Sequence, residues 1–580
     1  MPVRRASDVR IVPYRQPIAR RSPYMGGASL LVLAVAGLAP ASAQAAEECG
    51  AGPTVVCSPT GNPYGTGINY STNSGLDLSF APGVAVDASG ADGIHVNNSE
   101  AGDVVVNTTN GSVRSADRIG IYVNNSAGGV TITTGDVTSD GSNAVYAHGN
   151  GPVAIDTTAG TVAGRGGIYA WSNTAAITIT TADVRSTGGG AISASSYSAA
   201  ATIDIDTTAG TISTEGDHSS GIAASSYVTD GPIRIVTGNV STTGMYSNAV
   251  TGAQMSVGNS APLVIDTTAG AISTQGDYSI GVGAYAASRA EVRTGPITTA
   301  GVESAGVYAH GAQAPVAVDT TAGTIQTRGA SSAGILVSNA EGETTITAGQ
   351  ISTSGDAAIG IAFTSQNEGD AAAYRTDIVA TGPITATGAN AGGIVARDVG
   401  PGGPVNVTAR ANISAPGQNA VGIAAGSFGA PVTVTVDPGV TVMGGWSQNA
   451  GDLSTGASRS STGVDEGVVS TYVGGGLPAA GIVLFSGATA GSPAARLINN
   501  GIIGAMNDRA VTMGFPCAGR SGLSGSLLLF NTTPTAPGGK SWLGTFASAI
   551  MNAIVPSARA AAPPASRGCD PGDPDWGVPP

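Results

Sequence analysis

A short phrase recurs along most of this chain: a small residue, then Ile or Val, then a spacer, then a small or apolar residue. Neighbouring copies lie about 23 to 33 residues apart, until a longer gap precedes the last one. The copies begin at Gly93, Gly120, Ala144, Gly167, Ala191, Gly221, Ala249, Gly281, Gly306, Gly334, Gly360, Gly393, Gly422 and Gly481. Self-similarity at this period indicates a repeat protein in which each repeat stacks on its neighbours.

The composition favours strands over helices in these repeats. Gly accounts for 88 of 580 residues, charged residues for 11% and aromatic residues for 4%, while 41% of residues are hydrophobic. The patterned stretches are rich in Val, Ile and Thr, whose branched side chains favour β-structure. We therefore predict an all-β fold, a parallel β-helix of about 14 coils, one for each copy of the phrase.

One coil can be read from residues 153–162. Val153, Ile155 and Thr157 alternate with Ala154 and Asp156, so the two sets point to opposite faces of a strand. The phrase Asp-Thr-Thr-Ala-Gly in this coil recurs about every 50 to 60 residues, which is twice the basic period. Two types of coil are therefore expected to alternate.

The N-terminus has the features of an export signal over residues 1–45. Six arginines precede an apolar run, Ala28 to Leu38, that is too short to span a membrane, and a small-x-small cleavage site follows at Ala43-Gln44-Ala45. Removing this segment changes the net charge from 24 − 38 = −14 to 18 − 37 = −19. Such an acidic chain is a poor partner for nucleic acid or anionic membranes.

The four cysteines lie near the two ends of the mature chain. In an exported protein, Cys49, Cys57, Cys517 and Cys569 are expected to form disulfides. Pairing Cys49 with Cys57 and Cys517 with Cys569 closes the shortest loops, although two other pairings and metal binding remain open. We expect the disulfides to fasten the end coils.

The pattern divides the mature chain into five parts. These are an N-terminal cap (46–80), β-helix repeats (81–443), a Gly/Ser-rich insertion (444–476), the last coils (477–530) and a C-terminal cap helix with a Pro/Ala-rich tail (531–580). The helix is predicted because Trp542, Phe546, Ala549, Ile550 and Ala553 fall on one helical face before Pro556. This face either caps the final coil or binds a partner.

The chain resembles the passenger region of Gram-negative autotransporters over roughly residues 46–515. The resemblance rests on the spacing of Cys49 and Cys57, on residues 62–70 (Asn-Pro-Tyr-Gly-Thr-Gly-Ile-Asn-Tyr) and on the Ile/Val/Thr-rich coils. It implies a right-handed, pectin-lyase-like β-helix that is displayed on the cell surface or released from it.

The sequence also departs from that family. Residues after 515 are too few for a membrane barrel, and the Asn-Pro-Asn-Leu motif of two-partner secretion is missing. We therefore expect an exported protein that is periplasmic, extracellular or on the cell surface, with a separate outer-membrane translocator as a possible partner. A truncated autotransporter without independent function is an alternative.

Polysaccharide lyases and hydrolases also use β-helices, so catalysis is the main rival function. Asp156, Asp206, Asp266 and Asp319 recur on alternate coils, about 10 Å apart, which is too far to share one metal ion. Recurrence favours a structural hydrogen bond at a turn. The polar turn Glu215–His218 is read as solvated, and no nucleophile, zinc or phosphate-binding motif is found. We predict no catalytic residue, cofactor or metal.

Tyrosines at the spacer position of the phrase are the best candidates for a binding surface. Tyr122, Tyr146, Tyr169 and Tyr308 all occupy it, and alternation places them on the outer face. A ladder of outward aromatic rings either binds a glycan or a host cell-surface protein, or it shields the sheet. We expect an adhesive or interaction role without catalysis.

Overall fold

The computed structural model describes residues 48–506, 511–514 and 527–531, with gaps inside the first range. The gaps are 199–200, 228–230, 257–260, 312–314, 340–341, 367–373, 400–402, 428–429, 447–478 and 487–494. Several expectations fall on other residues: the export signal, Cys517, Cys569, the C-terminal helix and most of the insertion lie outside the described part of the chain.

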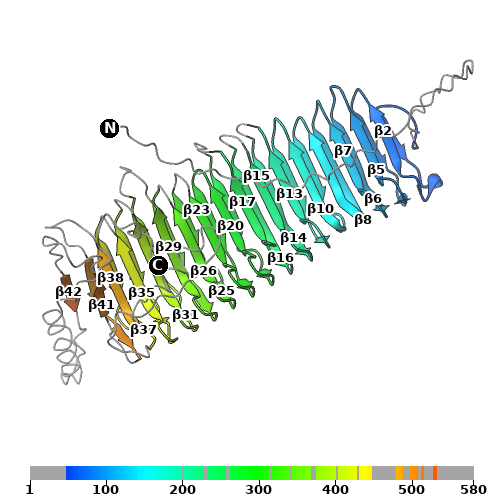
Figure 1. Ribbon diagram of the computed structural model, residues 1–580. Helices are drawn as coiled ribbons and strands as arrows, with labels where there is room; N and C mark the ends of the chain where they lie inside the picture. Colours follow the sequence, from blue (N-terminus) through cyan, green and yellow to red (C-terminus); the bar gives the residue numbers. More distant parts are fainter. Residues whose placement is uncertain are drawn as a thin grey trace, which may run out of the picture. The chain divides into compact units, whose positions relative to one another are not determined.

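The described chain is a parallel β-solenoid, as predicted. Its strands follow one another along a single axis in chain order, from β2 to β41 (Figure 1). The Ile and Val residues of all 14 phrases lie in register on adjacent strands, so the phrases enclose about 13 full turns. The number of turns is close to the predicted number of coils.

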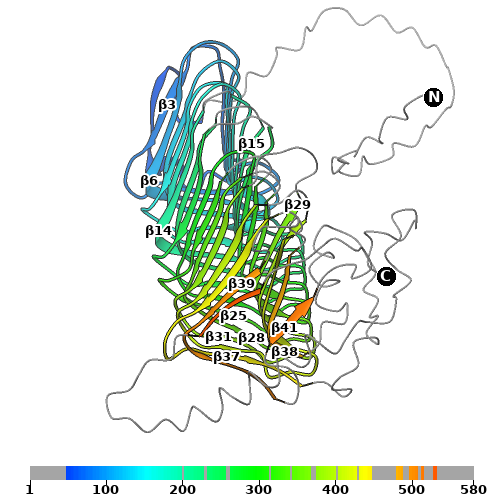
Figure 2. The ribbon, with the colours of Figure 1, turned by 90° about the vertical axis from the view of Figure 1, so that its left-hand side faces the viewer.

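Each coil contributes strands to three faces, which we name A, B and C, and these run the length of the stack (Figure 2). Face A carries the repeated phrase. Its strands are β2 (Ile68–Thr72), β5 (Ile94–Asn98), β7 (Ile121–Asn125), the ends of β8 (Val130–Gly149) and β10 (Val162–Ser172), β13 (Ile192–Ser196), β15 (Ile222–Ser226), β17 (Val250–Gln254), β20 (Val282–Ala286), β23 (Val307–Gly311), β26 (Ala333–Asn339), β29 (Ile359–Gln366), β32 (Gly392–Val399), β35 (Val421–Ser427), β38 (Ala480–Ser486) and β41 (Val511–Gly514).

Face B follows face A in each coil and carries the Asp-Thr-Thr-Ala-Gly phrases. Its strands are β1 (Thr54–Cys57), β3 (Leu76–Phe80), the start of β6 (Val104–Ser115), the start of β8, β9 (Val153–Thr157), β11 (Ile177–Thr181), the starts of β14 (Ile203–Thr214) and β16 (Ile233–Thr242), β18 (Leu263–Thr267), β21 (Ala290–Thr294), β24 (Val316–Asp319), β27 (Thr344–Ala348), β30 (Thr376–Ala380), β33 (Val405–Ala409), β36 (Val432–Val436), β39 (Ala495–Asn499) and β42 (Leu527–Asn531).

Face C closes each coil before the next copy of the phrase. It contains β4 (Ala85–Ala88), later parts of β6, β8, β14 and β16, the start of β10, β12 (Val184–Ser186), β19 (Ile272–Thr274), β22 (Ile297–Thr299), β25 (Thr324–Thr327), β28 (Gln350–Thr353), β31 (Ile384–Ala386), β34 (Ile413–Ser414), β37 (Thr441–Gly444) and β40 (Ile502–Ala505). The short 3-10 helix η1 (Pro59–Gly61) lies near the N-terminal end.

The core is a continuous set of stacked aliphatic side chains. On face A, Ile121, Val145 and Ile168 lie directly above one another and are almost completely buried. Each pairs with a residue of the same kind in the coils above and below, because alternation within a strand sends the same positions inward in every coil. Burying each such side chain contributes on the order of 1.5–3 kcal/mol.

A column of glycines fixes the corner between faces C and A. A Cβ atom built on Gly276 would lie 1.9 Å from the carbonyl oxygen of Gly244, and one built on Gly329 would lie 1.7 Å from that of Gly301. No side chain fits at such a distance. Glycine is therefore required wherever the backbones of successive coils approach this closely.

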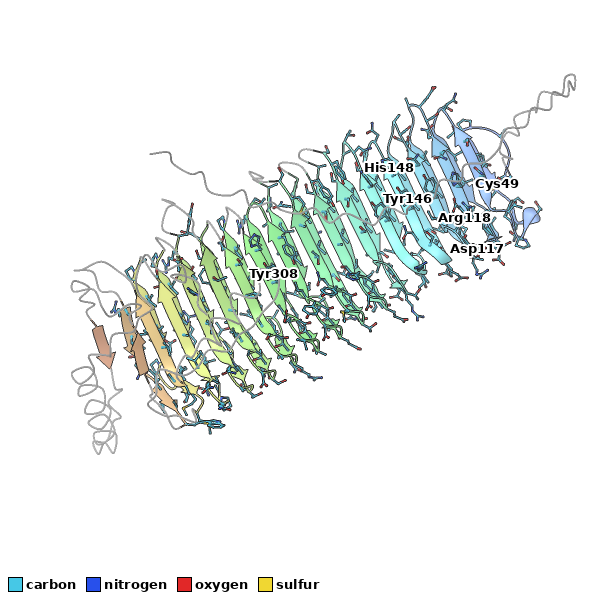
Figure 3. All side chains as sticks on the ribbon, in the orientation of Figure 1. Cys49, Asp117, Arg118, Tyr146, His148 and Tyr308 are labelled. Carbon is cyan, nitrogen blue, oxygen red and sulfur yellow. A yellow bond between two sulfur atoms is a disulfide. The ribbon has the colours of Figure 1, made fainter. Side chains whose placement is uncertain are left out.

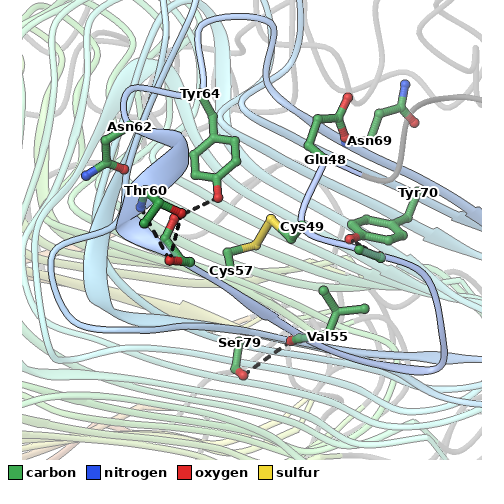
Figure 4. Close-up of a disulfide and its surroundings, with 12 residues drawn as sticks. Glu48, Cys49, Val55, Cys57, Thr60, Asn62, Tyr64, Asn69, Tyr70 and Ser79 are labelled. Atoms are coloured by element: carbon green, nitrogen blue, oxygen red, sulfur yellow. Dashed lines mark hydrogen bonds between the residues drawn. A yellow bond between two sulfur atoms is a disulfide. The ribbon is translucent and has the colours of Figure 1, made fainter.

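The N-terminal end is fastened by the predicted Cys49–Cys57 disulfide (Figure 4). The Glu48 carboxylate accepts a hydrogen bond from the Asn69 backbone N–H at 2.8 Å, and the Tyr70 hydroxyl donates to the Gly50 carbonyl oxygen at 2.9 Å. These contacts hold residues 48–57 across the first coil. Strands β2 and β3, within the range assigned to the cap, already pair with β5 and β6.

Candidate binding surface

Three of the four predicted tyrosines form a stacked ladder on the outer side of face A. Tyr122, Tyr146 and Tyr169 occupy the same position on β7, β8 and β10, and their ring centroids are 5.1 Å apart at each step. His95 on β5 extends the ladder, with its ring 4.6 Å from that of Tyr122. The rings stack because the spacing between parallel strands, about 4.8 Å, suits rings in near-parallel planes.

The stacking decides which parts of the rings a partner can reach. The planes of Tyr122, Tyr146 and Tyr169 differ by only 7 to 11°, so the face of each inner ring is covered by its neighbours. The ladder therefore presents ring edges and hydroxyl groups to solvent. Each stacked pair adds about 0.5–1.5 kcal/mol beyond area burial, so this part of the ladder also shields and stabilises the sheet.

Burial raises the pKa values of the three tyrosines in the ladder. Burial and the neighbouring Tyr146 raise the pKa of Tyr169 to about 12, and burial also raises the pKa values of Tyr122 and Tyr146. A phenol with its usual pKa of 10.0 is already protonated near neutral pH, and the raised values extend the protonated, hydrogen-bond-donating form to more alkaline pH.

His148 lies beside the ladder (Figure 3), and burial lowers its pKa. Its Nδ1 lies 2.7 Å from Asn124 Oδ1, and its Nε2 lies 3.1 Å from Asn173 Nδ2. These contacts fit a neutral ring that donates through Nδ1 and accepts at Nε2.

Trp171 contacts both the ladder and the aromatic residues at the corner between faces A and B. Its ring is tilted by 59° from that of Tyr169, so the two rings meet at an angle. It then stacks on Tyr197 at 5.1 Å, and Tyr197 stacks on Tyr227 at 4.6 Å. Tyr197 and Tyr227 come directly after β13 and β15. We call these two tyrosines the AB line.

A second aromatic stack lies at the opposite ends of neighbouring face A strands. His218, Tyr246 and Tyr278 stack at 5.0 and 4.8 Å, with planes only 4 and 8° apart. Each adopts a positive φ of 54 to 56°, which is uncommon for a non-glycine residue, and each precedes its face A strand by four residues. We call these three residues the CA line.

Exposed apolar side chains gather around these two lines. Tyr197, Tyr227, Tyr246 and Tyr278 are 38 to 46% exposed. Met245 and Met255 lie on either side of β17 and are 41 and 58% exposed, and Val302, before β23 in the coil after Tyr278, is 40% exposed. Between the lines, the outward positions of β13, β15 and β17 carry the small residues Ser193, Ala223 and Thr251. A band of small side chains therefore lies between the AB line, which follows β13 and β15, and the CA line, which precedes β15, β17 and β20.

Tyr308 does not belong to the predicted ladder, although it occupies the equivalent position on β23. Between it and Tyr169, this position holds Ser193, Ala223, Thr251 and Gly283, none of which is aromatic. Tyr308 is only 8% exposed and packs against Tyr285 at 5.3 Å. Figure 3 shows it farther along the stack than Tyr146. The shared position in the repeat was therefore not enough to predict that Tyr308 belongs to the ladder. A continuous stack needs an aromatic residue at this position in every coil.

The AB and CA lines were missed by the sequence analysis, although a signal for them exists. Tyr197 and Tyr227 each follow a Ser that ends a face A strand, and Tyr246 and Tyr278 each stand two residues after a glycine of the corner column. Aligning all positions of the repeat, including the turns, would have revealed both stacks.

The repeated aspartates have the structural role that was predicted. Asp156 Oδ1 accepts hydrogen bonds from the backbone N–H of Thr158 at 2.9 Å and from its hydroxyl at 2.7 Å. Asp206, Asp266 and Asp319 make the same pair of bonds to the threonine two residues on. Thr180 separates Asp156 from Asp206 in the register, so these aspartates lie on alternate coils.

The acidic turn at residues 215–218 is also tied into the stack. Asp217 Oδ1 accepts a hydrogen bond from the Met245 N–H at 2.8 Å, and Glu215 pairs with Arg185 at 2.7 Å. Within the described residues, no three His, Cys, Asp or Glu side chains are grouped so that they could hold a metal ion.

The described residues also include no helix that is long and apolar enough to cross a membrane. Comparisons with protein-family models, with curated proteins and with solved structures give no match to this chain.

Proposed function

We propose that this protein is an exported, non-catalytic scaffold that binds a partner through the band on face A between the AB and CA lines. The observation that carries this proposal is the concentration of exposed Tyr and Met side chains directly after β13, β15 and β17 and in the turns before β17 and β20. Exposed apolar surface that gathers in one place marks interaction sites more often than scattered side chains do. Tyrosine is favoured at such sites because it combines apolar area with a polar hydroxyl.

The chemistry of the band favours a neutral partner. Its outward side chains Ser193, Ala223 and Thr251 are small and uncharged, while Glu215, Asp217 and Asp277 lie in the turns that carry the CA line. An anionic ligand would meet repulsion from these carboxylates, and none of the outward residues Ser193, Ala223 and Thr251 could offset it with a positive charge. We therefore infer a neutral glycan or an uncharged patch of a cell-surface protein.

Export is the second part of the proposal. It is supported by the signal-like residues 1–45, by the disulfide between Cys49 and Cys57, which is typical of oxidising compartments, and by the strongly acidic mature chain. A cell-surface, extracellular or periplasmic location follows, with a separate translocator as the outer-membrane partner. Resemblance to autotransporter passengers agrees with an adhesive role.

The binding site can be tested on a glycan array and on intact host cells. We expect Tyr227→Ala and Tyr246→Ala each to weaken binding at least about tenfold, since hot-spot aromatic residues contribute more than about 1–2 kcal/mol. Tyr146→Ala is the matched control, because its ring faces are already covered within the ladder. Binding that is lost with Tyr146 and retained without Tyr227 and Tyr246 would place the site on the ladder.

Localisation is tested by cell fractionation with surface proteolysis. The chain is expected in the medium, on the surface or in the periplasm, with cleavage after Ala45. Retention of the uncleaved chain in the cytoplasm would overturn the proposed export.

A further inference from the structure

A line of side-chain hydrogen bonds crosses four successive coils on the outer side of face A, beside the tyrosine ladder. Its central members occupy one outward position on β5, β7, β8 and β10. Six hydrogen bonds of 2.7 to 3.2 Å join the members, which we call the polar line. In order along the line, they are Asp92, His95, Asn97, Asn124, His148, Asn173 and Trp171.

The two ends of the polar line fix its direction. At one end, the indole N–H of Trp171 can only donate, and it donates to Asn173 Oδ1 at 3.1 Å. At the other end, the ionised carboxylate of Asp92 can only accept, and it accepts from His95 Nδ1 at 2.7 Å. When both imidazole rings are neutral, each residue between the ends accepts from one neighbour and donates to the next. Every bond then runs from Trp171 toward Asp92.

This direction determines where the two imidazole rings carry their protons. Asn173 Nδ2 donates to His148 Nε2, so His148 carries its proton on Nδ1 and donates it to Asn124 Oδ1. His95 likewise accepts at Nε2 from Asn97 Nδ2 and donates through Nδ1. The polar line is therefore complete only while both rings are neutral, with one donor at each contact.

A second proton on His148 is incompatible with this arrangement. The proton on Nε2 would point at the Asn173 amide group that donates to the same nitrogen. If the Asn173 side chain turned its oxygen toward His148, its N–H groups would face the indole N–H of Trp171 instead. The oxygen and nitrogen of one amide group point to different neighbours, so Asn173 cannot accept from both. Protonation of His148 therefore breaks one of the two hydrogen bonds that connect Trp171 to the line.

We propose that the polar line is a pH-sensitive support for Trp171, in which His148 is the group that takes up the proton. While His148 is neutral, Asn173 holds the Trp171 indole, which stacks on Tyr197 of the AB line at 5.1 Å. Uptake of a proton by His148 releases the indole N–H and loosens the contact with Tyr197. The line thus positions an aromatic ring that joins the ladder to the AB line.

The surroundings of His148 agree with this role. Burial lowers the pKa of His148, and a hydrogen bond that the neutral ring accepts opposes protonation further. The carboxylate of the line, Asp92, lies at the far end, beside His95. The side chains that contact or adjoin the His148 ring are uncharged at neutral pH: Asn124 on β7, Trp171 on β10, Asn173 after β10 and Tyr146 on the same strand.

Nitrogen-15 NMR of the full chain, labelled at histidine and tryptophan, tests the proton positions and the response of the indole. The chain has four histidines and four tryptophans, so single substitutions assign the ring signals. At about pH 8, above the ordinary pKa of histidine, we expect the proton on Nδ1 in both His95 and His148. On acidification, the indole N–H signal of Trp171 should shift with the midpoint of His148, below pH 6.5. A proton on Nε2 of either neutral ring, or a Trp171 signal that stays constant while His148 titrates, would overturn the proposal.

Two matched variants separate the polar line from an effect of burial alone. Asn173→Ala removes the donor that faces Nε2 of His148, so the midpoint of His148 should rise by about 0.5 to 1 pH unit. Asn124→Ala removes the acceptor of the Nδ1 proton, which the neutral and the charged ring both donate, and should not raise the midpoint. Each variant uncovers the same ring by one asparagine side chain, so burial alone would raise the midpoint in both. Equal upward shifts, or no shift in Asn173→Ala, would contradict the proposal.

Discussion

The outer side of face A differs between the two halves of the solenoid, although the inner side is the same. From β5 to β10 the outward position holds His95 and three stacked tyrosines that remain partly exposed. From β26 to β38 it holds Leu, Ala and Val residues that are buried. The inward positions carry mostly Ile, Val and Ala in both halves, with exceptions such as Gly252 on β17 and Phe363 on β29.

This difference separates the requirements of the fold from those of the surface. Stacking needs only strand-compatible residues at outward positions, because the inward columns and the corner glycines already determine the coil. The outward positions are thus free to serve different purposes. In the N-terminal half they carry the tyrosine ladder that shields the sheet, and in the C-terminal half they are aliphatic and buried.

The largest expected effect tests whether the two halves share one core. Ile168→Ala and Ile394→Ala each remove a buried inward side chain and should each lower the free energy of unfolding by about 2–5 kcal/mol. Denaturant unfolding followed by circular dichroism measures both. If the two variants lower the free energy of unfolding by amounts that differ by more than about 2 kcal/mol, the cores of the two halves are packed differently, as their outer surfaces are.

An intermediate effect compares the two outer surfaces. Leu336→Ala should lower the free energy of unfolding by about 2–3 kcal/mol, because the side chain is buried. Tyr169→Ala should lower it by about 1 kcal/mol, because the ring is partly exposed and its removal mainly breaks the stacking contacts. The same unfolding experiment applies. Equal decreases in the free energy of unfolding for the two variants would contradict the distinction between buried outward residues in the C-terminal half and a partly exposed ladder in the N-terminal half.

Asp398 on β32 gives a smaller, pH-dependent difference. Burial raises its pKa, although its Oδ2 accepts a hydrogen bond from the Gly403 N–H at 2.6 Å. The folded chain then holds this proton more tightly than the unfolded chain does. The contribution of Asp398 to stability is therefore present below its usual pKa of 3.8 and lost as the pH rises through the folded value.

Replacing Asp398 by Asn removes this titration. We expect the stability of the Asp398→Asn variant to fall less than that of the wild type between acidic and neutral pH, as measured by unfolding at several pH values. Asp87→Asn is a control, because the Asp87 side chain is about half exposed and pairs with Arg114 on the surface. An unchanged pH profile for Asp398→Asn would show that this carboxyl group is solvated.

The smallest effect is spectroscopic. Tyr169 should ionise near pH 12, because burial and neighbouring tyrosines raise its pKa. The difference in tyrosinate absorbance between the wild type and Tyr169→Phe isolates this group. The folded state favours the neutral form of the Tyr169 ring. The contribution of Tyr169 to the free energy of unfolding is therefore fully present below pH 10 and is lost as the pH rises toward 12. Ionisation near pH 10 would mean that Tyr169 is exposed.

The solenoid could be predicted from the repeat pattern of the amino-acid sequence alone. The repeated Gly-Ile phrase predicted parallel coils and their approximate number, and alternation within residues 153–162 predicted which side chains face the core. The turn role of the Asp-Thr-Thr-Ala-Gly aspartates and the Cys49–Cys57 pair could also be read from the sequence. These features are local, or they repeat in every coil, so periodicity alone carries the information.

The contacts between outward side chains of different coils could not be predicted from the repeat and became evident from the folded chain. The contacts of Tyr197 with Tyr227, and of Tyr246 with Tyr278, depend on turns of variable length that lie outside the repeated phrase. Tyr308 fits the phrase and yet lies among buried apolar residues, because its neighbours in the adjacent coils are Gly283 and Leu336. Contact between coils joins residues some 30 positions apart, and a pattern read along one strand does not include those neighbours.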